Sequence, residues 1–317
     1  AHHGDEASSA EVAYALAVEL LSEPQPTWLN DATLWIVPWV NPDGYVVGSR
    51  YNAHSVDLNR NYDFAWSASS FGSGPSAFSE PETRSVRVHG HFHRPMASLS
   101  LHSGATNIGY VWNYTTASAD DQPTLVAQAT IYADACKTDG FWITNGAAWY
   151  VTHGDTNDWS YGRYGVPDFT VELTPEKTPS AENIPIFLDD HLDAVIAFLA
   201  TPPAISGQVV DAVTGTPLDA RIELLRSDGT PAAAPLYTSP TSGRFAHFTV
   251  TPSDKIRVWA PGWTEVVVDA EASVIELERG QLAGGRPSPV RLVQGSGVVR
   301  LPVPYSGIVD LHRAGAE

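Results

Sequence analysis

The chain has 317 residues, 43% of them hydrophobic, which is enough for one large domain and a smaller module. A formal net charge of -18 argues against nucleic-acid binding, because that function needs clustered lysine and arginine. No run of about 18 apolar residues occurs, so we expect no membrane span. The single cysteine, Cys136, excludes an internal disulfide and a thiolate metal cluster.

The first 200 residues alternate between segments typical of helices and segments typical of buried strands. Helices are expected over 7–22, 79–92, 124–138 and 187–200, and strands over 33–40, 97–104 and 169–173. Ser8 or Ser9 is expected to cap the first helix, and Ser79 to form a capping box with Glu82 in the second. The alternation predicts an α/β domain with a mixed, largely parallel sheet flanked by helices.

The sequence pattern changes after Thr201. Short strand-like segments follow, separated by turn signals such as 214–217 and 227–229, and no helical period survives. This pattern predicts a small all-β sandwich. The last segment, from Gln281, is also β-rich and forms either extra strands or the start of a further β module.

Three residues at two places in the chain have the side chains of a metal site. His3 and Glu6 lie about one helical turn apart, close enough to bind one ion. His102 lies near the carboxyl end of the strand expected over 97–104, the edge where ligands of open α/β sheets gather. Two histidines and a glutamate are typical of catalytic zinc sites that keep one open position. His2 competes with its neighbour as the first ligand.

Other polar residues are suited to an anionic substrate and to proton transfer. Arg50, Asn59 and Arg60 follow the first expected strand, over 33–40, and such arginines bind carboxylates in a bidentate manner. Tyr150 lies on a loop and could close over a substrate. Glu172 lies between apolar strand residues, where a carboxylate is costly unless it is paired or functional, so it is a candidate general base. Taken singly, each has an ordinary explanation as a surface ion pair, a packed aromatic or a solvent-facing strand residue.

Taken together, these motifs resemble the M14 zinc carboxypeptidases, and they occur in the order found in that family. The matching segments are His3–Glu6, Asn41–Gly44, Arg50 with Asn52, Asp57–Asn61, Ser79–Thr83, His102, Tyr150 with Asp158-Trp159, and Glu172-Leu173. The resemblance covers roughly residues 1–200. It implies a zinc-dependent exopeptidase that hydrolyses the C-terminal peptide bond of peptides or proteins.

The resemblance also implies a role for the residues at the reacting centre. His3, Glu6 and His102 would bind one Zn²⁺ per chain, and the family's His-x-x-Glu spacing selects His3 over the preceding histidine. Glu172 would be the general base that activates the zinc water and passes its proton to the leaving amine. Arg50 would stabilise the oxyanion.

Four further residues would contact the substrate. Asn59 and Arg60 would clamp its terminal carboxylate, and Tyr150 would cap the site. Asn157 would lie deep in the pocket for the C-terminal side chain. An aspartate there would predict a preference for lysine or arginine, and a large aliphatic residue an apolar preference. Asn157 is neutral, although Asp155 could partly substitute, so we expect a basic or polar C-terminal residue.

The all-β part also resembles a known domain. Residues 205–220 are similar to the transthyretin-like, or carboxypeptidase-regulatory-like, domain that follows the catalytic unit in the N/E-type (M14B-like) branch. We therefore expect a zinc carboxypeptidase catalytic domain over 1–202 with its N-terminal part missing, a transthyretin-like sandwich over 203–280, and a β-rich tail over 281–317. Because only two residues precede His3, we expect this chain alone to be poorly stable or to bind zinc weakly.

Other functions of the same superfamily stay open. One is a peptidoglycan-peptide carboxypeptidase or an amidase, although amidases usually lose the Asn59-Arg60 clamp. Another is a non-catalytic peptide-binding scaffold, which would typically lose the base or a ligand. The partners expected are peptide or protein C-termini, with no nucleic acid, for a monomer that is secreted or periplasmic. The histidines of 89–93 form either a second metal site or, as we favour, a solvated connection.

Overall fold

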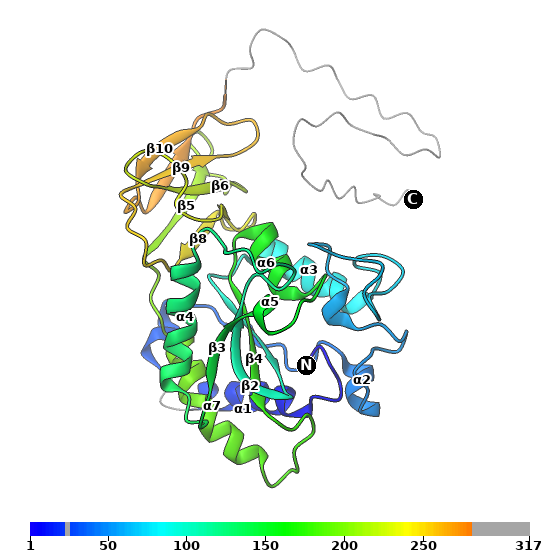
Figure 1. Ribbon diagram of the computed structural model, residues 1–317. Coiled ribbons are helices and arrows are strands. Elements are labelled where there is room, and N and C mark those ends of the chain that lie inside the picture. The colour runs from blue at the N-terminus through cyan, green and yellow to red at the C-terminus, as the bar shows by residue number, and fades with distance from the viewer. Residues whose placement is uncertain (23–25, 281–317) are drawn as a thin grey trace, which may run out of the picture. The chain divides into compact units, whose positions relative to one another are not determined.

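A mixed four-stranded sheet forms the centre of the first part of the chain in this computed structural model, which describes residues 1–22 and 26–280 (Figure 1). Its strands are β1 (Ser98–His102), β2 (Ala105–Tyr110), β3 (Trp142–Asn145) and β4 (Asp168–Thr174), in the spatial order β1-β4-β2-β3. β1 pairs with β4 in parallel, and so does β2 with β3, whereas β2 runs antiparallel to β4. The mixed α/β fold flanked by helices is as expected.

The two faces of this sheet differ in chemistry because side chains alternate along each strand. In the strand register, His102 lies beside Glu172, and Glu172 beside Asn107. These three residues therefore share one polar face. The other face is apolar and is part of the hydrophobic core, with Leu99, Leu101, Ile108, Ile143, Phe169, Val171 and Leu173. The sequence alternation thus sends the reactive side chains to one side and the core to the other.

Helices cover both faces. α1 (Ala7–Leu21), α4 (Gln122–Ala135) and α7 (Ile184–Leu199) bring apolar residues to the core, and they lie on the same side of the sheet (Figure 1). The remaining helices are α2 (Pro42–Val47), α3 (Pro81–His93), α5 (Gly146–Trp149) and α6 (Thr156–Tyr164), with two short 3-10 turns, Thr27–Asn30 and Leu58–Arg60. All four helices expected from the sequence are confirmed. No helix in the described part of the chain is long and apolar enough to cross a membrane.

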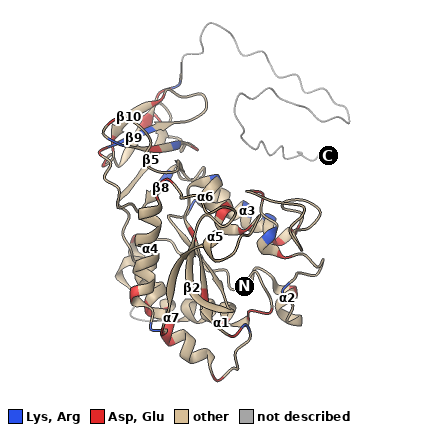
Figure 2. Cartoon of the chain, in the orientation of Figure 1, with Lys and Arg blue, Asp and Glu red and all other residues tan. Residues whose placement is uncertain are grey.

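Acidic residues on α7 contribute to the net negative charge (Figure 2). Lys137 pairs with Asp189 at 3.3 Å and with Asp193 at 3.1 Å. Both carboxylates are well exposed, so these pairs add little to stability.

Three local expectations were wrong. The structure has no strand over 33–40, because no strand among the described residues pairs with this segment. Near its end, Ala1 N donates to the Pro38 carbonyl, and Asn41 N donates to the Ala1 carbonyl. The cap of α1 is Glu6 rather than a serine, and Ser9 donates to the Glu6 carbonyl.

The expected capping box of α3 is also absent. Glu80 is the N-cap residue, and Ser79 donates to the Glu80 carboxylate. Asn61 contacts the start of this helix instead, since its Oδ1 accepts from Glu80 N at 3.3 Å and from Thr83 Oγ1 at 2.8 Å. A residue distant in sequence thus replaced a local cap.

The second part of the chain is built from strands in two sheets. The strands are β5 (Ile205–Asp211), β6 (Arg221–Leu225), β7 (Leu236–Tyr237), β8 (Arg244–His247), β9 (Lys255–Trp259), β10 (Val266–Asp269) and β11 (Val274–Leu277). Their orders are β10-β9-β6-β7 and β11-β5-β8, and apolar residues from both sheets form one hydrophobic cluster. Separate domains with boundaries at 202/203 and 280/281 stay a prediction, and the expected tail lies outside the described residues.

Candidate active site

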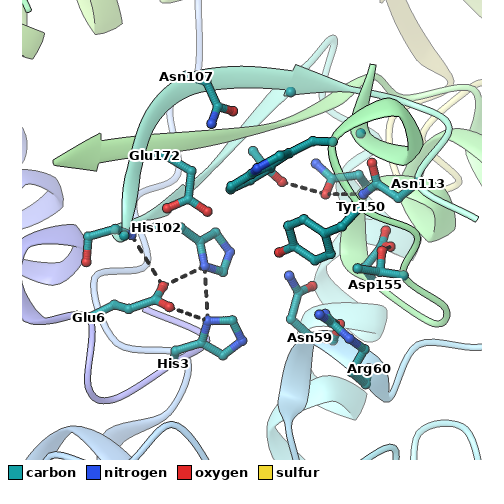
Figure 3. A pocket seen from close by; sticks show the side chains of 18 of the residues that line it. His3, Glu6, Asn59, Arg60, His102, Asn107, Asn113, Tyr150, Asp155 and Glu172 are labelled. Carbon is teal, nitrogen blue, oxygen red and sulfur yellow. Dashed lines mark hydrogen bonds and ion pairs between the residues drawn. The ribbon is translucent and has the colours of Figure 1, made fainter. Parts of the chain in front are cut away.

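Three potential metal ligands meet at one end of the sheet (Figure 3). His3 and Glu6 lie in the turn before α1, and His102 ends β1. His3 Nδ1 is 2.9 Å from Glu6 Oε1, and His102 Nδ1 is 2.8 Å from Glu6 Oε2. The two Nδ1 atoms are 3.2 Å apart, and all three side chains are buried. Two imidazole nitrogens and a carboxylate therefore surround one point.

The Asn41–Gly44 motif supports the turn that carries these ligands. A Cβ atom on Gly4 would lie 2.0 Å from the Gly44 backbone carbon, so the two segments pack together only because Gly4 has no side chain. Asn41 Nδ2 donates to the His2 carbonyl at 3.1 Å, and its Oδ1 accepts from Gly44 N at 2.9 Å as the cap of α2. These contacts fix the backbone beside the first ligand.

Asp57 orients the first ligand from behind. Its Oδ1 is 3.0 Å from His3 Nε2, which leaves Nδ1 of that ring facing the other ligands. Its Oδ2 accepts from Arg50 Nε at 2.9 Å. A carboxylate that holds the second nitrogen of a histidine is the usual partner of a metal-binding imidazole.

The ionisation of these groups suits a cation. Burial lowers the pKa of His102 to about 4, so its imidazole is neutral near pH 7. Burial opposes the ionisation of Glu6, but His102 and His3 hold the pKa of that carboxyl well below its usual range. Burial also disfavours the charged form of His3, yet its hydrogen bonds with Asp57 and Glu6 raise its pKa.

We predict that zinc binding weakens as the pH falls through the raised pKa of His3. The metal must displace the His3 proton, so the apparent affinity should fall by about tenfold per pH unit on the acid side. Competition with a chromophoric chelator between pH 8 and pH 5.5 measures this. The H89Q variant changes a histidine on α3 that is not one of the three ligands. It should show the same dependence of zinc affinity on pH and bind one zinc per chain. An affinity that does not vary with pH would contradict the prediction.

We predict that D57N lowers zinc affinity by about 10- to 100-fold, because losing the charged acceptor frees the His3 ring. Zinc titration of the purified variant measures this. Asp63 offers a matched control, since it pairs with Arg163 at an exposed site, and D63N should bind zinc as the wild type does. Equal affinities for D57N and D63N would show that Asp57 does not orient the ligand.

Glu172 has the properties of a general base. It lies on β4 opposite His102 in register and is 6% exposed. Burial, reinforced by the charge of Glu6, raises the pKa of Glu172 to about 7 against the opposing effect of His3, Lys177 and Arg50. A carboxylate with this pKa exchanges protons readily near neutral pH.

Arg50 lies at the edge of the ligand cluster. Its Nη1 is 3.2 Å from His3 Nδ1 and 3.5 Å from Glu6 Oε1, while its Nε binds Asp57. The side chain is 25% exposed. Its guanidinium therefore contacts the ligands and also lines the cavity.

Asn59, Arg60 and Tyr150 form the wall opposite the ligands (Figure 3). Asn59 Oδ1 accepts from Thr156 N at 3.0 Å, which leaves its amide nitrogen for other partners. Arg60 Nη1 donates to the Asn59 carbonyl at 2.6 Å. Tyr150 follows α5 and is 48% exposed, and Figure 3 shows its hydroxyl directed into the cavity.

Asn157 is deeply buried, and the fold engages its amide. Its Nδ2 donates to the Asp168 carbonyl at 2.9 Å, and its Oδ1 accepts from Asn113 Nδ2 at 3.1 Å and Thr170 Oγ1 at 2.8 Å. Asp155 is engaged too, because it caps α6 and accepts from Thr152. This end of the cavity is therefore lined by two amides, a hydroxyl and the Asp155 carboxylate.

All nine residues selected from the sequence line one cavity of about 210 Å³. Sequence reasoning missed Lys177, whose Nζ lies 3.3 Å from Glu6 Oε1, and Asn107 on β2. It gave no role to Asp57, although that residue stood inside a quoted motif.

The histidines of 89–93 lie on α3. Across the described ranges, His3, Glu6 and His102 are the one group of three or more potential metal ligands.

Comparisons with known proteins identify the family of this chain. The sequence profile of the family described as zinc carboxypeptidase matches residues 1–194. The chain is 29% identical over 236 residues to Carboxypeptidase SOL1 of Arabidopsis thaliana, which covers 68% of this chain and 47% of that protein. It is 28% identical over 252 residues to Carboxypeptidase M of Mus musculus, covering 68% and 55%. The chain thus spans about half the length of these relatives.

Solved structures share the fold. Bovine thrombin-activatable fibrinolysis inhibitor, in complex with tick carboxypeptidase inhibitor, matches with a TM-score of 0.56 and 22% identity over 63% of this chain and 79% of that one. Carboxypeptidase A from Helicoverpa armigera matches with a TM-score of 0.53 and 22% identity over 62% and 58%. The fold and the ligand cluster define an α/β metalloprotein. The chain belongs to the zinc carboxypeptidase family, whose members use Zn²⁺ and hydrolyse peptide bonds.

Proposed function

We propose that this chain is a zinc-dependent exopeptidase that removes the C-terminal residue of peptides or proteins. One observation carries the proposal: the ligand cluster with Glu172 and the pair Asn59 and Arg60 line the same cavity. A peptide whose terminal carboxylate meets the pair would place its last peptide bond near the ligands. That geometry favours cleavage at the chain end.

His3, Glu6 and His102 fit Zn²⁺ because two imidazoles and one carboxylate leave a fourth position open. When bound there, Zn²⁺ supplies Lewis-acid chemistry, activating water and polarising the scissile carbonyl. The ligand atoms lie within 4.8 Å of one another, and Asp57 already orients one ring. We expect one Zn²⁺ per chain.

Glu172 and Arg50 would carry out the proton and charge transfers. Glu172 would accept a proton from the attacking water and deliver it to the nitrogen of the departing residue. Arg50 would donate to the oxygen of the tetrahedral intermediate as negative charge develops there. Its ion pair with Asp57 holds the guanidinium at the rim of the ligand cluster.

Asn59, Arg60 and Tyr150 would bind the end of the substrate. The planar guanidinium of Arg60 matches a carboxylate in a bidentate geometry, and the Asn59 amide adds a neutral donor. Tyr150 would cover the bound residue. At the far end, Asn157 would face the C-terminal side chain, and the neighbouring amides with the Asp155 carboxylate favour a basic or polar residue there. A peptidoglycan peptide would meet the same clamp and stays within the proposal.

The chain's other expected features are proposals of the same kind. Residues 203–280 would form a transthyretin-like sandwich, supported by two sheets that share one hydrophobic cluster. Monomeric state and secreted or periplasmic location stay predictions.

A series of blocked dipeptides that differ in the C-terminal residue tests the function. We expect release of the free C-terminal amino acid, loss of release with a chelator, and recovery with Zn²⁺. C-terminal amides of the same dipeptides serve as the control and should be poor substrates. A zinc-loaded, folded protein that cleaves no peptide would support the non-catalytic scaffold instead.

A further inference from the structure

Asn107 is a buried polar residue without a visible purpose. It lies on β2 and is 0% exposed. Neither Nδ2 nor Oδ1 of its side chain has a hydrogen-bond partner within the described ranges. Burying an amide in this state is unfavourable, so an unpaired group of this kind in a protein interior calls for an explanation.

The strand register places Asn107 beside Glu172. The two residues are paired across the antiparallel β2 and β4, so their side chains leave the sheet on the same face as close neighbours. His102 is paired with Glu172 on the other side, on β1. Figure 3 shows the Asn107 and Glu172 side chains projecting from adjacent strands toward the same region.

Glu172 has an unpaired acceptor oxygen, which complements the unpaired amide donor of Asn107. Its Oε2 is buried and has no partner among residues 1–22 and 26–280. The nearby cations are engaged elsewhere, since Lys177 pairs with Asp5 and Glu6, and Arg50 with Asp57 and Glu6. An orphan donor and an orphan acceptor thus stand side by side.

We propose that Asn107 is a positioning residue for Glu172: its Nδ2–H donates to Glu172 Oε2 and fixes the orientation of that carboxylate. The other oxygen, Oε1, then faces the cavity, where the proton of the attacking water arrives. Rotation about χ2 of an asparagine is soft, so the amide reaches this geometry without strain. Asn107 lines the same cavity but is 0% exposed, so we assign its effect to contact with Glu172 rather than with substrate. The inference rests on the proposed role of Glu172 as the base.

Kinetic constants of zinc-loaded variants test this role. N107L keeps the branching at Cγ but has no donor, and we expect kcat to fall by about tenfold, the typical cost of one hydrogen bond to a charged group, with KM within about twofold. N107S, which restores a short donor, should recover part of kcat. Thr144 lies on β3 with its hydroxyl bonded to the Asn145 carbonyl, so T144V is a matched control on the same face and should keep kcat.

A second measurement needs no activity. In protein labelled with ¹⁵N in asparagine side chains, N107L identifies the Asn107 resonance. That resonance should move upfield in E172A, in which the acceptor is gone, and should not move in T144V. The proposal is overturned if the resonance is the same in the wild type and E172A, if N107L keeps full kcat, or if it raises KM alone. Absence of peptide hydrolysis by the wild type would refute the proposed function, while the resonance would still report on the contact.

Discussion

Replacing Glu172 with glutamine is expected to lower kcat by about 10²- to 10⁴-fold, the usual contribution of a general base. Glutamine keeps the size and the position on β4 but cannot accept a proton. Glu172 is not one of the three clustered ligands, so E172Q should keep one zinc per chain. Steady-state kinetics with a blocked dipeptide, together with metal analysis, measure both quantities.

The role of Glu172 as a base also predicts how kcat/KM changes with pH. Burial raises the pKa of Glu172 to about 7, and a cation bound nearby would lower it because a cation favours the charged carboxylate. The wild-type kcat/KM should therefore fall on the acid side below pH 7, as Glu172 becomes protonated and can no longer act as a base. E172Q should lose this acid limb from its residual activity.

Glu176 is an exposed glutamate just beyond the same strand and makes a matched control. E176Q should keep both the wild-type kcat and the acid limb. If E172Q turned over substrate at the wild-type rate with zinc bound, Glu172 would not be the base. If E176Q were as impaired as E172Q, general charge rather than proton transfer would explain the effect.

The ligand side of the site could be predicted because its determinants are local. His3 and Glu6 are three residues apart, and the apolar strand before His102 is readable from its alternation. Glu172 was found because a carboxylate within an apolar strand is conspicuous. These features depend on short stretches of sequence, and the sheet then brings them together.

The rest depends on contacts between distant segments. β2 contains glycine and asparagine, which are poor strand formers, and it forms a strand because β4 and β3 pair with it on both sides. Without β2, neither Asn107 nor its relation to Glu172 could be foreseen. Conversely, the apolar run at 33–40 predicts a strand, but no described strand pairs with it.

The predictions of the helix caps were wrong for the same reason: the contacts at a helix start can come from a distant segment. Asn61 supplies contacts at the start of α3 from a separate loop, and no local pattern reveals this. Asp57 likewise binds both His3, which is distant in sequence, and Arg50, and no local pattern predicts the two contacts together. The chemical roles of the reactive residues could be predicted from the sequence. The contacts that hold them in place could be identified only from the three-dimensional structure.

Replacing Arg60 with alanine is expected to lower kcat/KM by roughly 10- to 100-fold for peptides with a free C-terminus, because a charge-assisted, bidentate contact is lost. The loss should appear mainly in KM, since the clamp holds the substrate rather than the reacting atoms. Peptides with an amidated C-terminus cannot use the clamp, so R60A should process them at the low wild-type rate. The variant would thereby lose discrimination as well as affinity.

R60K separates charge from geometry at this position. Lysine keeps the charge but not the planar fork, so its kcat/KM should lie between those of R60A and the wild type. Arg163, which pairs with Asp63 at an exposed site, supplies the control variant R163A, and it should bind substrate normally. An R60A enzyme that still prefers free carboxylates by the wild-type ratio would place the clamp elsewhere in the cavity. In that case cleavage at chain ends would need another anchor, and Arg50, which also lines the cavity, would be the candidate.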